Sequence, residues 1–291
     1  MIPRKFRERY QDIAGDADSF FSALEKPPPF SFRVNTLKAT PEAIVRRFED
    51  YGIALASVPW CPGAFIADRP VSATLEHALG MIYIQDLASM LPALALHNAV
   101  PEGTILDMCA APGSKTTQLA ALMKNKGAIV ANDANPHRVK ALIFNIEKAG
   151  TLNTVVARYD GRAFPDEPFD AVLLDAPCSS EGTRPLRDWT PRYRKAALQK
   201  QLITHAFDLL SPGGVLVYAT CTFAPEENEA VVDFLLRNRD ASIEPTKLNV
   251  PSANGLTEWH GAAFDTSLEK TVRVWPHLNN TDGFFIAMVS K

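Results

Sequence analysis

The stretch FDAVLLDAPCSS, residues Phe169 to Ser180, joins an apolar run to a polar turn. The apolar half is typical of a strand that is buried on both faces of a parallel sheet. The turn places Asp175, Pro177 and Cys178 at the carboxyl end of that strand. Ligands of open α/β sheets bind at this end. The stretch therefore predicts the fold class and the place of a functional site.

Two other strand-like runs end in comparable turns. TILDM (104–108) leads into the small-residue loop CAAPGSK (109–115), and GVLVYAT (214–220) is followed by Cys221. From about residue 103, strands alternate with helices, which indicates parallel βαβ units with right-handed crossovers. The last 50 residues contain strand-like segments that favour an antiparallel closure at the sheet edge. We therefore expect an α/β fold in which the three strand ends converge.

The first 70 residues differ from this pattern and predict an accessory module. Amphipathic helical spacing before the proline run at 26–29 indicates one or two short helices, which either cap the main domain or contact substrate. A βαβ-type unit follows, with Thr40 as the N-cap of its helix. Such a unit is too small for a core of its own, which predicts domains at 1–70 and 71–291. Four cations either face phosphate or form an ordinary solvated surface: Arg33, Lys38, Arg46 and Arg47.

The composition excludes several classes of protein. The 291 residues are 46% hydrophobic, carry a net charge of −3 and include four cysteines without a C-x-x-C pair. The six histidines match no metal spacing, so we predict no metal site. No apolar run approaches a membrane span, and the N-terminus lacks an apolar signal core. We expect a reduced, cytoplasmic protein that is monomeric and not bound to a membrane.

The loop at 109–115 has the features of a ligand cradle. It precedes a helix N-terminus, where unpaired N–H groups and small residues allow a ligand to approach closely. Its spacing matches neither a P-loop nor a dinucleotide fingerprint. Asp133 ends the next strand about 20 residues later, where a ribose would be bound, and Asp160 ends a third. The acids favour a neutral or cationic nucleoside such as S-adenosylmethionine; the alternative is a doubly wound protein with surface aspartates.

Two cysteines at adjacent strand ends suit the methylation of a pyrimidine at carbon 5. A thiolate that adds to carbon 6 makes carbon 5 electron-rich, and the thiol must later be eliminated. One cysteine would be the nucleophile and the other would assist release, although spacing alone does not assign Cys178 and Cys221. Lys115 would favour the thiolate, and Asp175 would contact the base at N3 and N4. The alternative for each cysteine is a small buried apolar residue.

CAAPGSKTTQL, DAPCSSEGT and YATCTFAPEENEAVV resemble, in order and spacing, the Nop/Sun family of RNA cytosine-C5 methyltransferases, and in particular its compact archaeal transfer-RNA members. RVNT near residue 33 and DGFFIA at 282–287 are also similar. The resemblance implies a Rossmann-like S-adenosylmethionine-dependent methyltransferase domain with a small α+β N-terminal RNA-binding module. It assigns Cys221 as the nucleophile and Cys178 to product release, with Lys115 and Asp175 at the cytosine. It places these residues at the cofactor: Cys109, Ala110, Ala111, Pro112, Gly113, Ser114, Lys115, Asp133, Arg138, Asp160 and Asp175.

The implied substrate is RNA, with a cytosine flipped from the fold. Transfer RNA is the first candidate and ribosomal RNA the second. A non-catalytic RNA-binding or assembly factor with the same fold is the remaining alternative, against which the two cysteines argue. A basic insert from Arg184 to Lys200 predicts a phosphate track. Its cations are Arg184, Arg187, Arg192, Arg194, Lys195 and Lys200.

Overall fold

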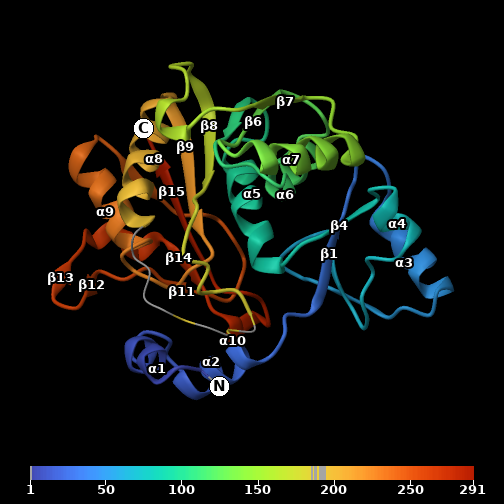
Figure 1. The fold of residues 1–291 in the computed structure, drawn as a ribbon, viewed down its shortest axis with the longest axis horizontal. Helices are drawn as coiled ribbons and strands as arrows, with labels where there is room; N and C mark the ends of the chain where they lie inside the picture. The colour runs from blue at the N-terminus through green and yellow to red at the C-terminus, as the bar shows by residue number, and fades with distance from the viewer. Residues whose placement is uncertain (1, 185, 187–188, 190–194) are drawn as a thin grey trace.

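A nine-stranded mixed sheet forms the centre of the computed structural model, which describes residues 2–184, 186, 189 and 195–291 (Figure 1). The strand order is β11-β14-β15-β9-β8-β5-β6-β7, with β10 paired to β15. Five strands are parallel: β5 (Thr104–Asp107), β6 (Ala128–Asn132), β7 (Thr154–Ala157), β8 (Phe169–Asp175) and β9 (Leu210–Thr220). Four join antiparallel at one side: β10 (Ser242–Glu244), β11 (Ala253–Asn254), β14 (Val272–Val274) and β15 (Phe284–Ser290). The predicted α/β fold with an antiparallel closure is confirmed.

Helices cover both faces of this sheet, which explains the apolar run in β8. Ala171 and Leu173 pack with α5 (Leu87–Ala99) and α6 (Ser114–Leu122). Val172 and Leu174 point to the other face, toward α8 (Ala196–Asp208) and α9 (Glu229–Asn238). Because successive side chains alternate between faces, a strand that is covered twice needs apolar residues at every position. α7 (Pro136–Ala149) lies beside α6.

The strand order reverses between β5 and β8. The chain passes from β5 outward to β6 and β7 and then returns to β8 on the other side of β5. At such a switch point the connections leave in opposite directions and open a crevice at the carboxyl ends of the strands. The fold therefore places the turns after β5, β8 and β9 around one crevice.

A second, four-stranded sheet forms a small lobe, seen at the right of Figure 1. Its order is β2-β3-β1-β4, and β1 and β2 each run antiparallel to β3. The predicted βαβ-type unit is therefore a split one: β1 and β2, connected through α3, lie on either side of β3. Thr40 Oγ1 caps α3, as predicted, by accepting from Ala43 N at 3.2 Å. The bounds are β1 (Phe30–Val34), α3 (Pro41–Asp50), β2 (Leu55–Ser57), β3 (Ala64–Ala67), α4 (Leu75–Ala78) and β4 (Ile82–Ile84).

The lobe has an aromatic core in which Phe32 packs against Phe48 and Phe65. Its last strand, β4, comes after residue 70, and the domain division at 70 stays a prediction. The two N-terminal helices, α1 (Arg4–Tyr10) and α2 (Ala17–Glu25), pack elsewhere, on the main domain beside α10 (Pro276–Asn279). Phe6 and Phe20 contact Phe223 there, so these helices cap the chain that follows β9.

The remaining elements are short: η1 (Gly161–Ala163), β12 (Glu258–Trp259), β13 (Ala262–Ala263) and η3 (Thr266–Lys270). Within the described ranges, no helix combines the length and the apolar character needed to cross a bilayer.

Candidate active site

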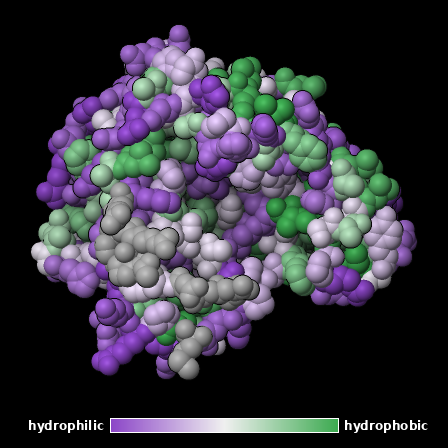
Figure 2. All heavy atoms as spheres, in the orientation of Figure 1, coloured by the Kyte–Doolittle hydropathy of each residue, from purple (hydrophilic) through white to green (hydrophobic). Residues whose placement is uncertain are grey.

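A cavity of about 470 Å³ opens at the carboxyl ends of the parallel strands. The space-filling view is hollowed between the small lobe and the main body (Figure 2). Seven residues proposed from the sequence line the cavity: Cys109, Asp133, Arg138, Asp160, Asp175, Cys178 and Cys221. Its wall also includes Ser180, Lys195 and Leu198. The expected convergence of the strand ends is therefore observed.

The other proposed residues lie behind or beside this cavity. Ala110 and Ala111 are buried, and Gly113 is the N-cap of α6 with φ +103°. Pro112 and Ser114 complete the loop, and their carbonyl oxygens accept hydrogen bonds from Asn145 and Arg33. Because a Cβ at Gly113 would lie 3.0 Å from Leu142 Cδ1 and the φ is left-handed, glycine is required at this position.

The two cysteine sulfurs lie 3.2 Å apart, although 43 residues separate them in sequence. Cys178 follows β8 and is buried, whereas Cys221 follows the neighbouring strand β9 and is half-buried. Both residues line the cavity, so a ring that enters it meets two sulfur atoms.

The contact between the sulfurs makes the two thiols unequal. The two sulfurs are within hydrogen-bond distance, and this contact lowers the pKa of Cys221 and raises that of Cys178, as expected if the Cys178 thiol is the donor. Ser180 Oγ, 3.5 Å from the Cys221 sulfur, and the charge of Lys115 lower the pKa of Cys221 further. Burial instead raises the pKa of Cys109 far above its usual range. These contacts favour ionisation of the Cys221 thiol over that of Cys178.

Lys115 and Asp175 form an ion pair at one end of the cavity, with Nζ 2.6 Å from Oδ2. The lysine side chain is 6% exposed and that of the aspartate 32%, so the carboxylate faces the cavity and the ammonium lies behind it. Lys115 also donates to Ser89 Oγ at 3.1 Å.

The acids at the cofactor side suit a cationic nucleoside. Asp133 ends β6, is buried, and has Oδ2 3.1 Å from Arg138 Nη1, but that oxygen accepts no hydrogen bond among the described residues. Asp160 pairs with Arg162, whose hydrogen bonds lower the pKa of the carboxyl to about 2. Burial raises the pKa of Asp107, at the end of β5, to about 7. Asp133 Oδ2 has an ion-pair partner but no hydrogen-bond donor among the described residues, and a ribose hydroxyl would supply one, so these residues fit S-adenosylmethionine.

Hydroxyl and carboxylate groups hold the two cysteine turns together. Ser179 Oγ lies 2.8 Å from Thr222 Oγ1, which links the residue after Cys178 to the residue after Cys221. The buried Glu227 accepts from Ser179 N at 2.9 Å and from Gln199 Nε2 at 3.1 Å. Sequence reasoning missed these residues, because their pairing depends on which strands are adjacent.

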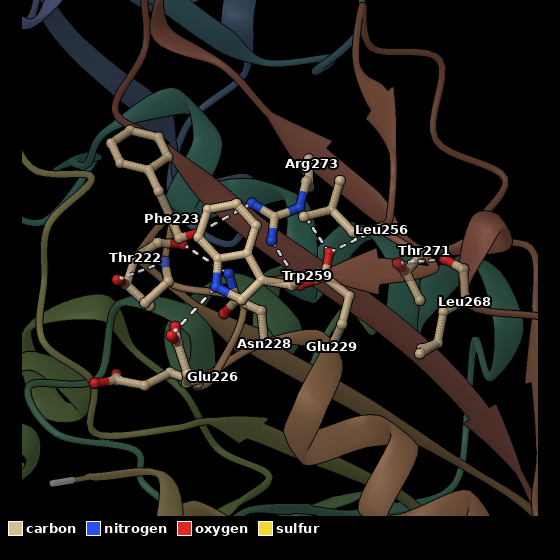
Figure 3. A network of polar contacts seen from close by, with 12 residues as sticks. Thr222, Phe223, Glu226, Asn228, Glu229, Leu256, Trp259, Leu268, Thr271 and Arg273 are labelled. Atoms are coloured by element: carbon tan, nitrogen blue, oxygen red, sulfur yellow. Dashed lines mark hydrogen bonds and ion pairs between the residues drawn. The ribbon is translucent and has the colours of Figure 1, made fainter. Parts of the chain in front are cut away.

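A second network of polar contacts supports the turn after Cys221 (Figure 3). Arg273 on β14 forms a buried ion pair with Glu229 on α9, at 2.5 and 2.6 Å. The same guanidinium donates to Phe223 O at 3.1 Å, and Asn228 Nδ2 donates to Thr222 O at 2.9 Å. These contacts fix the backbone directly after the half-buried cysteine.

The predicted phosphate track is wrong for Arg184. Its side chain is 1% exposed and pairs with Asp282, with Nε 3.6 Å from Oδ1, because the turn after β8 folds back on the chain before β15. Lys195 is exposed and donates to Cys178 O, and Lys200 lies 5.1 Å from the centre of the Phe234 ring. Three cations of the insert lie outside the described residues: Arg187, Arg192 and Arg194.

The four cations of the N-terminal region have different environments. Arg33 is buried and Arg47 pairs with Glu76 at 2.5 Å. Lys38 donates to two backbone carbonyl oxygens, and Arg46 is exposed. They do not form one phosphate-facing surface. Among the described residues, no group of three or more metal-ligating side chains is found.

Comparison with known proteins identifies relatives over the whole chain. The family described as 16S rRNA methyltransferase RsmB/F matches residues 93–290, and the N-terminal domain of 16S rRNA methyltransferase RsmF matches residues 2–87. A tRNA (cytosine(49)-C(5))-methyltransferase of Pyrococcus abyssi is 42% identical over 100% of this chain and 96% of that protein. A ribosomal RNA small subunit methyltransferase F of Vibrio parahaemolyticus is also 42% identical over the full chain, which spans only 63% of that protein.

Solved structures are also similar over nearly the whole length of this chain. A methyltransferase homolog from Pyrococcus horikoshii superposes with a TM-score of 0.88, at 35% identity, over 100% of this chain and 95% of that one. NSun6 from the same organism, solved with SFG, an S-adenosylmethionine analogue, gives a TM-score of 0.86 at 26% identity, over 99% of this chain and 98% of that one.

Proposed function

The chain belongs to the 16S rRNA methyltransferase RsmB/F family of S-adenosylmethionine-dependent RNA cytosine-C5 methyltransferases, and we propose that it methylates carbon 5 of a cytosine in transfer RNA through a covalent adduct with Cys221. Family membership confirms the resemblance to Nop/Sun enzymes. The observation that carries the proposed mechanism is the pair of sulfurs, 3.2 Å apart, in the wall of the cavity.

In the proposed reaction, the Cys221 thiolate attacks carbon 6 of the cytosine. The new carbon–sulfur bond moves the ring electrons toward carbon 5, which then accepts the methyl group. The proton on carbon 5 is then lost to a base, the electrons of that bond re-form the double bond between carbons 5 and 6, and the carbon–sulfur bond breaks to release the Cys221 thiolate. We assign the base to Cys178, whose sulfur lies 3.2 Å from that of Cys221.

Lys115 and Asp175 orient the base in this proposal. The Asp175 carboxylate faces the cavity and accepts from Lys115, and it has room to accept from the exocyclic amino group of cytosine. Uracil carries an oxygen in place of that amino group, so the same carboxylate would repel it. The ion pair thus fixes both the orientation and the choice of base.

S-adenosylmethionine, when bound, supplies an electrophilic methyl group carried on a sulfonium. Asp133 would accept from the ribose, and Asp160 and Arg138 would line the nucleoside side of the site. Cys109 and the small residues 110–114 would let the cofactor approach the N-terminus of α6.

Transfer RNA is the proposed substrate because the chain covers 96% of the Pyrococcus abyssi transfer-RNA enzyme but 63% of the Vibrio ribosomal-RNA enzyme. The test is incubation with radiolabelled S-adenosylmethionine and either unmodified transfer RNA or 16S rRNA transcripts. We expect label in transfer RNA, as 5-methylcytosine. Label in 16S rRNA alone would move the proposal to ribosomal RNA. RNA binding without label in either RNA would favour the non-catalytic binding factor.

The covalent step has its own test. With both RNA and cofactor present, Cys178→Ala is expected to accumulate a protein–RNA adduct that survives denaturing electrophoresis, because methylation proceeds but elimination is impaired. Cys221→Ala should form none, and Cys61→Ala, which changes a buried cysteine outside the cavity, should behave as wild type. An adduct in Cys221→Ala but not in Cys178→Ala would exchange the two roles.

A further inference from the structure

A second cavity, of about 170 Å³, lies between the small lobe and α7, and the proposed mechanism does not use it. β1 and β4 contribute Arg33, Ile82 and Tyr83, and α7 contributes Asn145 and Lys148. Ligand pockets for whole small molecules enclose about 300–1,000 Å³. This cavity therefore suits one part of a larger ligand rather than a complete small molecule.

The cavity contains a buried positive charge that no acid neutralises. Arg33 is 5% exposed, and its Nε and Nη2 donate to Gln85 Oε1, Ser114 O and Thr117 Oγ1, all of which are uncharged acceptors. Among the described residues, the hydrogen bonds of this guanidinium come from Nε and Nη2, and none of its partners is a carboxylate. Buried cations in proteins are normally paired with an anion. An anionic group in the cavity would supply the missing partner.

The surroundings are also cationic. Lys148 lines the cavity, and burial together with the nearby charge of Lys38 lowers its pKa. No aspartate or glutamate is among the described lining residues. The field inside this space therefore favours a negatively charged group, and such a group would relieve the repulsion between the two lysines.

The cavity offers an aromatic surface beside this charge. Tyr83 lines it, and the Arg33 guanidinium lies 4.9 Å from the centre of the tyrosine ring. Phe144, one turn before Lys148 on α7, is 61% exposed, and Lys148 Nζ lies 5.9 Å from its ring centre. A cationic groove with aromatic side chains is the combination that single-stranded nucleic acid recognises, through phosphate contacts and base stacking.

α7 connects this cavity to the active site. Arg138 on its first turns lines the catalytic cavity, and Asn145 lines the second one. Seven residues of helix separate them, which corresponds to about 10 Å along the axis. The two cavities therefore adjoin successive turns of one helix, so an RNA strand bound in the first could extend toward the second. We propose that this cavity binds one unpaired nucleotide of the RNA substrate, with its phosphate near Arg33 and Lys148 and its base against Tyr83. This inference rests on the proposed function, because it takes RNA as the substrate.

The test measures RNA binding separately from methyl transfer. Affinity for an unmodified transfer RNA transcript is measured at several salt concentrations for wild type, Lys148→Ala, Tyr83→Ala and Tyr83→Phe. Lys148→Ala should reduce the slope of log affinity against log salt by about 0.7, the value for one single-strand phosphate. Tyr83→Ala should weaken binding by roughly 5- to 150-fold, as expected for one stacked base, while Tyr83→Phe stays near wild type.

Lys126→Ala is the matched charge control. Lys126 is 64% exposed, pairs with Glu102 at 3.1 Å and lies outside the cavity, so its loss changes the net charge by the same amount. Ultraviolet crosslinking of a 4-thiouridine-substituted transcript should attach RNA to the peptide that contains Tyr83. Melting temperatures and S-adenosylmethionine affinities of the variants report whether the fold is intact.

The outcomes separate this inference from the proposed function. Wild-type affinity and salt slope in both Lys148→Ala and Tyr83→Ala, in a protein that still methylates RNA, would overturn the second site and leave the activity standing. Equal slope changes in Lys148→Ala and Lys126→Ala would reduce the effect to general charge and also overturn it. A wild-type protein that binds and methylates no RNA would overturn both proposals.

Discussion

At the scale of single residues, the contact between the two sulfurs, 3.2 Å apart, lowers the pKa of Cys221. A hydrogen bond from the Cys178 thiol would stabilise the Cys221 thiolate in this way. Without this hydrogen bond, the pKa of Cys221 should rise. On acidification, Cys221 should then become protonated at a higher pH than in wild type. We expect Cys178→Ala to shift the midpoint of Cys221 alkylation by iodoacetamide upward, measured peptide by peptide with mass spectrometry across a pH series. A midpoint that does not move would show that Lys115 or Ser180, rather than Cys178, controls the ionisation.

Asp107 provides a prediction on stability and pH. Burial raises its pKa from 3.8 to about 7, so between these values the folded protein holds a proton that the unfolded chain has released. Stability should therefore fall as the pH rises through this window. Asp107→Asn lacks the titrating group. Between pH 5.5 and 8.5, the free energy of unfolding of wild type should therefore fall by about 2 kcal/mol more than that of the variant. Denaturant unfolding at the two pH values measures this, and parallel losses would contradict it.

The sequence predicted the cysteine pair as a site but not its electrostatics. Strand ends and turn composition placed Cys178 and Cys221 at one sheet edge. The contact between the two sulfurs at 3.2 Å depends on the turns that carry them, which Ser179, Thr222 and Glu227 hold together. Such side chains find partners only after the strand order is fixed, and spacing along one chain does not give that order.

At the scale of elements, the Arg273–Glu229 pair joins β14 to α9 beneath the catalytic turn. Both side chains are at most 3% exposed, so loss of one partner leaves the other charge buried and unpaired. Glu229→Gln should cost about 3–5 kcal/mol of unfolding free energy, measured by denaturant titration. The double variant Arg273→Met with Glu229→Leu should lie closer to wild type, since no charge remains.

The exposed pair of Arg239 and Asp208 is the control for this prediction. Its members are 36% and 43% exposed, so Asp208→Asn should change stability by no more than about 1 kcal/mol. A similar cost for Glu229→Gln would show that the buried pair contributes little to the support of the turn.

Sequence patterns performed best for elements that are covered on both faces. The apolar run that forms β8 was predicted as a buried strand, because apolar residues at every position mark a doubly covered strand. The small lobe was less well located: the sequence indicated a βαβ-type unit but not the bounds of β2 and α4. Short edge strands and four-residue helices contain too few residues for a hydrophobic periodicity to be recognised.

At the scale of the whole molecule, Arg33 couples the lobe to the catalytic domain. Its three hydrogen bonds link β1 to Gln85, the residue directly after β4, and to the first turn of α6. We expect Arg33→Met to loosen the lobe, with faster amide hydrogen exchange in β1 to β4 than in wild type, while the exchange of β5 to β9 stays slow. Arg46→Ala, which changes an exposed cation of α3, should leave both parts unchanged. Uniformly faster exchange would instead indicate a single cooperative unit.

The arrangement of the two parts was the least predictable feature. The sequence indicated an accessory module but treated Arg33 as a surface cation, because a single chain does not reveal which charges a domain contact buries. Arg184 was misjudged for the same reason, since its partner Asp282 is 98 residues away. Contacts that form between distant segments are visible only in the folded molecule.

The buried joint at Arg33 has a consequence for attempts to recombine this gene with those of its relatives. A crossover that separates the codon for Arg33 from those for Ser114 and Thr117 would pair a guanidinium from one parent with a helix turn from another. Offspring of such crosses should be rescued more often when both segments come from the same parent. Libraries that exchange the lobe should therefore carry the first turn of α6 along with it.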